Sequence, residues 1–116
     1  MLEQLIGCRL ESVRLSKVSW SLEFQGAGVP LPHYSISTSA DVSVVVSGNE
    51  GKPTYEVIQD ILEDDLVDAR YDADNRTVTL WLRKGAQLVF SNRKYAGGDN
   101  SAIITNLANG EWELLA

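Results

Sequence analysis

The chain has 116 residues, with sixteen acidic and ten basic side chains and a net charge of -6. This length suits a single domain over residues 1–116 that builds its core without disulfides. The single cysteine, Cys8, excludes a disulfide within the chain. The acidic balance argues against nucleic acids and anionic membranes as partners, because both are bound through clustered lysine and arginine.

The N-terminal residues carry no targeting signal that we recognise. Residues 1–6 have no basic segment and no long apolar run, and no stretch approaches the roughly 20 apolar residues of a membrane-spanning helix. We therefore expect a soluble, cytoplasmic protein.

The first part of the chain is predicted to be a short helix followed by strands. Leu2, Leu5 and Ile6 are spaced for one helical face, and Gly7 is a natural stop. Strands are expected at 8–15 and at 18–25, of which the second alternates strictly between apolar and polar residues.

Regular structure should break at 26–32, which contains two prolines and two glycines. The alternation then resumes over 35–46 and predicts one long strand, bent or bulged because so long a strand is unusual.

The second part of the chain repeats the order of helix and strands. An apolar stripe opposite acidic residues predicts a helix at 53–64. Three strands should follow as a meander, and after a loop at 92–101 two short strands should close the chain. The five strands are expected at 66–72, 76–84, 86–91, 102–105 and 111–115.

The two parts can be overlaid, with residues 5–10 placed on residues 61–66. If the following turn is two residues longer, Trp20 falls on Val78 and Leu22 on Leu80. Two pseudo-repeated halves, each a helix followed by three strands, would explain this match. Any two segments of helix and strands could also align this well, so both interpretations stay open. Either way the fold class is α+β, with a mainly antiparallel sheet and two short helices.

The search for catalytic machinery finds little. His33, the single histidine, lies between Pro32 and Tyr34 in a predicted loop, and Cys8 is expected to be a small buried thiol. Residues 72–83 lack the glycine and the glutamate of a calcium loop and indicate a hairpin turn. The adjacent carboxylates at 63–65 should splay into water at a helix end. We predict a non-enzymatic protein with no cofactor and no metal.

The most distinctive feature is an acidic stretch. Residues 56–74 hold eight acidic residues against Arg70 alone, a net of seven negative charges. The stretch is either a solvated helix face with turns or a docking surface that steers and pairs with a basic protein. The second interpretation selects eight partner-binding residues: Asp60, Glu63, Asp64, Asp65, Asp68, Asp72, Asp74 and Trp81.

Trp81 is selected because of its place in the alternation. Val78, Leu80 and Leu82 should face inward, so Trp81 should face outward, where a tryptophan is a candidate interface anchor. The helix or a second layer could equally cover it. Trp112 is a weaker candidate on the same argument, as is Tyr95.

Three segments, 6–13 (IGCRLESV), 19–24 (SWSLEF) and 80–88 (LWLRKGAQL), resemble small bacterial immunity proteins. These are the cytoplasmic antidotes of contact-dependent growth inhibition and related polymorphic toxin systems. The resemblance implies a non-enzymatic protein that binds one cognate toxin domain, often a nuclease, and blocks its active site or substrate groove. No functional residue is carried over from the family, because no binding motif matches. Two other classes remain: a small-ligand or scaffold domain with a site near 26–34, and an enzyme centred on His33.

Overall fold

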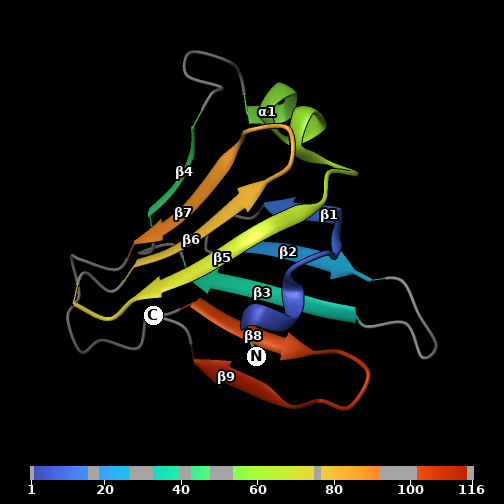
Figure 1. The fold of residues 1–116 in the computed structure, drawn as a ribbon, viewed down its shortest axis with the longest axis vertical. Coiled ribbons are helices and arrows are strands. Elements are labelled where there is room, and N and C mark those ends of the chain that lie inside the picture. The colour runs from blue at the N-terminus through green and yellow to red at the C-terminus, as the bar shows by residue number, and fades with distance from the viewer. Residues whose placement is uncertain are drawn as a thin grey trace.

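The computed structural model describes residues 2–15, 19–26, 33–39, 43–47, 54–74, 77–91 and 102–114. Within these ranges the chain forms two antiparallel sheets, a short 3-10 helix and one α-helix (Figure 1). The elements are η1 (Leu2–Leu5), β1 (Arg9–Leu15), β2 (Ser19–Gln25), β3 (His33–Ser39), β4 (Ser43–Ser47), α1 (Thr54–Ile61), β5 (Leu66–Asp72), β6 (Thr77–Leu82), β7 (Gln87–Ser91), β8 (Ala102–Asn106) and β9 (Trp112–Leu114).

The two sheets exchange strands between the two parts of the chain. Sheet A has the order β1-β2-β3-β8-β9, and sheet B has the order β4-β7-β6-β5. Thus β4 follows β3 along the chain but pairs with β7, whereas β8 follows β7 but pairs with β3. Neither sheet is built from one continuous segment, so the two parts of the chain are interlocked.

All strand pairs between named strands are antiparallel, as predicted, and the meander β5-β6-β7 is confirmed. The prediction of one long strand over 35–46 is wrong. Here β3 ends at Ser39 in sheet A, and β4 begins at Ser43 in sheet B. Alternation reports which side chains share a face, but it carries no information about which sheet a strand joins.

The two predicted helices are present but shorter than expected. The N-terminal one is the 3-10 helix η1, and α1 ends at Ile61 rather than at residue 64. Each is followed by a residue with positive φ, Gly7 at 90° and Glu63 at 64°. A left-handed residue ends a helix and turns the chain into the next strand.

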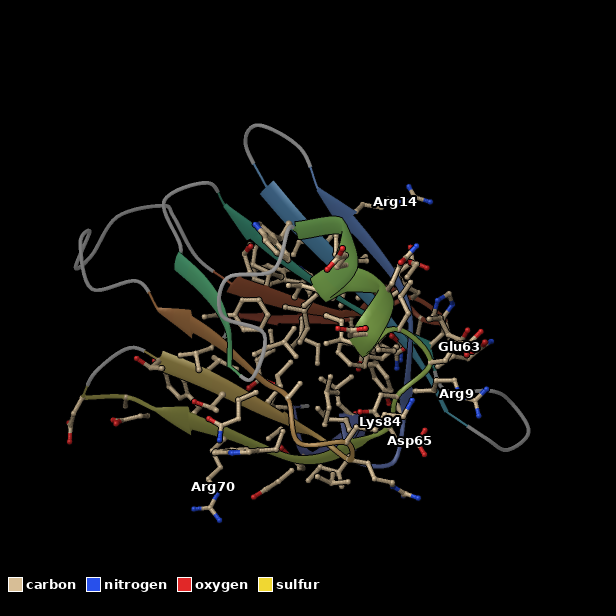
Figure 2. All side chains as sticks on the ribbon, turned by 90° about the horizontal axis from the view of Figure 1, so that it is seen from above. Arg9, Arg14, Glu63, Asp65, Arg70 and Lys84 are labelled. Carbon is tan, nitrogen blue, oxygen red and sulfur yellow. The ribbon has the colours of Figure 1, made fainter. Side chains whose placement is uncertain are left out.

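The core lies between the two sheets, where their inward side chains meet (Figure 2). Sheet A and sheet B each contribute six fully or nearly buried apolar residues, and burial of each is worth roughly 1.5–3 kcal/mol. They are Leu10, Leu22, Phe24, Tyr34, Ile36 and Ile104 from sheet A, and Leu66, Val78, Leu80, Leu82, Leu88 and Phe90 from sheet B. The helices add Leu2, Leu5 and Ile61 to the same cluster.

The sheets meet at one corner, where residues 7–10 and 63–66 exchange four backbone hydrogen bonds around a single bridge between Arg9 and Asp65. The bonds run from Gly7 N to Leu66 O (2.8 Å), from Glu63 N to Leu10 O (2.8 Å), from Leu10 N to Asp64 O (2.9 Å) and from Leu66 N to Cys8 O (2.8 Å). The four bonds therefore form two equivalent pairs. The bond from Gly7 N corresponds to the bond from Glu63 N, and the bond from Leu10 N corresponds to the bond from Leu66 N.

Candidate functional site

Asp68, Arg70 and Trp81 form a cluster on the outer face of sheet B, across β5 and β6. Asp68 lies opposite Trp81 in the strand register. The Arg70 Nε lies 3.2 Å from Asp68 Oδ2, and the guanidinium carbon lies 5.7 Å from the centre of the Trp81 ring. Arg70 thus lies between a carboxylate and an aromatic face, a cation–π arrangement worth about 0.5–1 kcal/mol at an exposed site. We call these three residues the Asp68–Arg70–Trp81 cluster.

The predicted direction of Trp81 is confirmed. Burial alternates along β6, with Val78, Leu80 and Leu82 buried and Trp81 half-buried on the opposite face. Among the described residues, Arg70 is the group placed over the indole ring. Figure 1 shows α1 at an end of the sandwich.

Asp65 lies between two arginines at the corner where the sheets meet. Its carboxylate oxygens are 3.9 Å from Arg9 Nε and 3.7 Å from Arg83 Nη2. Figure 2 shows Arg9 and Lys84 on the same corner as Glu63 and Asp65. Such exposed ion pairs contribute only about 0–1 kcal/mol. Their importance is electrostatic, since residues distant in the sequence offset much of the negative charge at this end of the acidic stretch.

Asp64 corrects the expectation that the carboxylates at 63–65 splay into water. Only 4% of Asp64 is exposed. Its Oδ1 accepts a hydrogen bond from the backbone N of Asp65 at 2.9 Å, and its Oδ2 accepts one from the backbone N of Lys84 at 3.0 Å. The carboxylate therefore connects the start of β5 to the turn between β6 and β7. The prediction of an outward Asp64 is wrong, and its carboxylate is not part of an external docking surface.

The other predicted acidic contacts lie at the surface. Asp60 is exposed on α1, and Glu63 is exposed at the corner. Asp72 and Asp74 are exposed at the far end of β5, where Asp72 Oδ1 accepts a hydrogen bond from Asp74 N at 3.0 Å. Asp60 and Glu63 lie before β5, whereas Asp72 and Asp74 lie at its other end. Their role as partner contacts stays a prediction.

The structure adds two apolar residues that sequence reasoning missed. Val67 and Tyr71 on β5 are 43% and 48% exposed. Val67 occupies an irregularity in the β5–β6 register between Leu66 and Asp68. A bulge interrupts the alternation of faces, so the simple pattern in the sequence could not place Val67.

The prediction that His33 lies in a loop is wrong. His33 begins β3, pairs with Gln25 of β2, and its Nε2 lies 3.4 Å from Glu23 Oε2. The Cys8 thiol is buried, as expected, and its Sγ lies 3.6 Å from the Gln4 carbonyl oxygen. Burial raises the pKa of Cys8 above its ordinary value, which keeps the thiol protonated and less nucleophilic near neutral pH.

The part of the chain that the structure describes holds no group of three or more His, Cys, Asp and Glu side chains placed to bind a metal ion. In the same ranges no helix has the length and apolar character needed to cross a membrane. Residues 27–32, part of the segment considered for ligand binding, lie outside the described residues.

Comparison with protein-family models, with curated proteins and with solved structures gives no match to this chain.

Proposed function

We propose that the chain is a non-enzymatic immunity-type inhibitor that binds and neutralises a basic toxin domain in the cytoplasm. In the family that the chain resembles, this toxin domain is often a nuclease. The resemblance of three segments to small bacterial immunity proteins supports this reading. The observation that carries it is the outer face of β5 and β6, where exposed Val67 and half-buried Trp81 lie beside the carboxylate of Asp68. Apolar anchors with a charged rim are what protein interfaces use for affinity and for steering.

We also propose that the two parts of the chain are pseudo-repeated halves. The strand registers support this, because pairs in β1–β2 recur in β5–β6 at the offsets the sequence overlay requires. The corresponding pairs are Leu10↔Phe24 with Leu66↔Leu82, Val13↔Leu22 with Ala69↔Leu80, and Leu15↔Trp20 with Tyr71↔Val78. Both first strands have their irregularity at the same place, Leu10/Ser12 and Leu66/Asp68.

The overlay gives an internal comparison of the two outer surfaces. Where the second half has Val67, the first half has Glu11, and where the second has Trp81, the first has Glu23. A framework common to both halves requires neither apolar residue on the outside. The apolar side chains thus distinguish the β5–β6 surface from its counterpart and favour it as the docking surface.

The proposal is tested by co-expression with the product of the neighbouring open reading frame in the native bacterium. The partner should arrest growth when expressed alone, and this chain should restore growth and co-purify with it in a fixed ratio. A partner that is harmless alone, or growth arrest that the chain does not relieve, would contradict the proposal.

The docking surface is tested with two variants of equal charge change. Asp72→Lys with Asp74→Lys alters the end of β5, and Glu111→Lys with Glu113→Lys alters the exposed end of sheet A. At low salt the first pair should slow association at least about tenfold and flatten its salt dependence, because steering depends on where charge lies. Equal effects of the two pairs would show that only net charge matters, and a larger effect of the control pair would place the interface on sheet A.

A further inference from the structure

We propose that Asp68 protects the edge of sheet B from pairing with a second copy of this chain. Strand β5 is the last strand of its sheet, and η1 packs against it. An edge strand presents unpaired N–H and C=O groups and can pair with another chain. This inference concerns the chain alone and does not depend on the proposed toxin.

The first outward-facing backbone groups of β5 are already used. Leu66 donates its N–H to Cys8 O and accepts a hydrogen bond from Gly7 N, both at 2.8 Å. In an antiparallel ladder every second residue directs both backbone groups away from its partner. Beyond the bulge at Val67, the next residue to face outward is Ala69, and its N donates to Asp68 Oδ1 at 2.9 Å. A side chain thus occupies the donor that an incoming strand would need.

The Asp68 carboxylate is held in place to do this. While Oδ1 accepts from Ala69 N, Oδ2 accepts from Arg70 Nε at 3.2 Å. Arg70 is in turn placed over the Trp81 ring. The Asp68–Arg70–Trp81 cluster therefore fixes the rotamer that caps the edge, which gives these three residues a role within the free protein.

A second copy is the occupant to be excluded, because two identical edge strands can pair antiparallel about a twofold axis. Such pairing would cover part of Val67 and Tyr71, now 43% and 48% exposed, on both copies. The bulge between Leu66 and Asp68 and the capped Ala69 N–H are two of the devices by which proteins block such pairing.

The other half of the chain offers a matched control. Ser12 of β1 occupies the position that corresponds to Asp68, and its buried Oγ has no hydrogen-bond partner in the described part of the structure. Ser12→Ala therefore removes a side-chain oxygen at the equivalent place without removing a cap.

Sedimentation over a wide concentration range separates the cap from the charge. The wild-type chain and Ser12→Ala should remain monomers of 12.8 kDa, whereas Asp68→Ala should approach twice this mass at high concentration. Asp68→Asn keeps an oxygen that can accept from Ala69 N and should remain a monomer, as should Asp72→Asn, which removes a charge from the same strand. Monomeric Asp68→Ala, or a dimeric wild type, would overturn the proposal. Equal association of Asp68→Ala and Asp68→Asn would show that charge, rather than the cap, guards the edge.

Hydrogen exchange of the Ala69 amide provides a test that no misfolded variant can obscure. In the wild-type monomer this amide should exchange about fivefold or more slowly than an unprotected amide, which is the effect of a hydrogen bond worth about 1 kcal/mol. Exchange at the unprotected rate would show that Asp68 does not cap the edge.

Discussion

Asp64 is a buried carboxylate that accepts backbone N–H groups from Asp65 and Lys84. Asp64→Ala leaves both donors without their partner, and we expect the free energy of unfolding to fall by about 2–3 kcal/mol. Asp64→Asn keeps one acceptor oxygen, so its free energy of unfolding should lie between those of Asp64→Ala and the wild type. The measurement is urea denaturation at neutral pH.

Asp74→Ala is the control for Asp64, since Asp74 is exposed at the end of the β5 hairpin. It should change the free energy of unfolding by no more than about 0.5 kcal/mol. If Asp64→Ala is as mild as Asp74→Ala, the Asp64 carboxylate does not hold the turn between β6 and β7.

The buried thiol of Cys8 predicts a pH dependence of stability. Its pKa is raised in the folded state by burial, so folding favours the protonated thiol. The stabilisation is complete below the pKa of the unfolded thiol, about 8.5, and is lost as pH rises through the folded value. Wild-type stability should therefore decline more steeply above this pH than that of Cys8→Ala, measured by urea denaturation from pH 7 upward. Parallel curves for the two proteins would contradict this.

At the scale of elements, the two helices end in the same left-handed conformation with different residues. Gly7 has φ 90° and Glu63 has φ 64°. Glu63→Gly should stabilise the chain by up to about 1 kcal/mol, because glycine adopts this conformation without a steric penalty. Gly7→Ala should destabilise it by about 1 kcal/mol through the backbone alone, since a Cβ at Gly7 meets no atom within 4 Å.

Thermal unfolding of both variants checks this pair of predictions. Changes of the same sign in the two proteins would mean that packing, rather than backbone conformation, dominates at the two helix ends.

The pattern of each element also explains the main failure of sequence reasoning at this scale. Over 35–46 the alternation of β3 continues into β4, although the two strands belong to different sheets. A period of two depends only on which face of a strand is buried, and both sheets bury their faces against the same core. The exchange of strands is therefore invisible in the local pattern.

For the whole molecule, the exchange of β4 and β8 predicts that the halves hold together without a covalent connection. A protease site inserted between Ser47 and Thr54 would cut the chain after folding. The two fragments should then co-elute and unfold in one transition, because β4 completes the sheet of the second half and β8 completes that of the first.

The uncut chain with the same insertion is the control for this experiment. Separation of the fragments under native conditions would mean that the paired strands and the shared core do not suffice to join the halves.

The sequence by itself determined the class of fold, the meander of the second half, the inward residues of β6 and the outward direction of Trp81. Each of these depends on local alternation, which the chain carries in full. It also located the acidic stretch, but not how its members are used.

Only the tertiary structure decided those uses. Asp64 became a buried cap because the turn at Lys84, 20 residues further on, packs beside it. Asp65 acquired Arg9 and Arg83 as neighbours because the first strands of the two halves meet at one corner. Asp68 gained Arg70 and Trp81 from the register of β5 on β6. Contacts between residues far apart in the chain set the burial and the electrostatic environment of each carboxylate, and no local pattern encodes them.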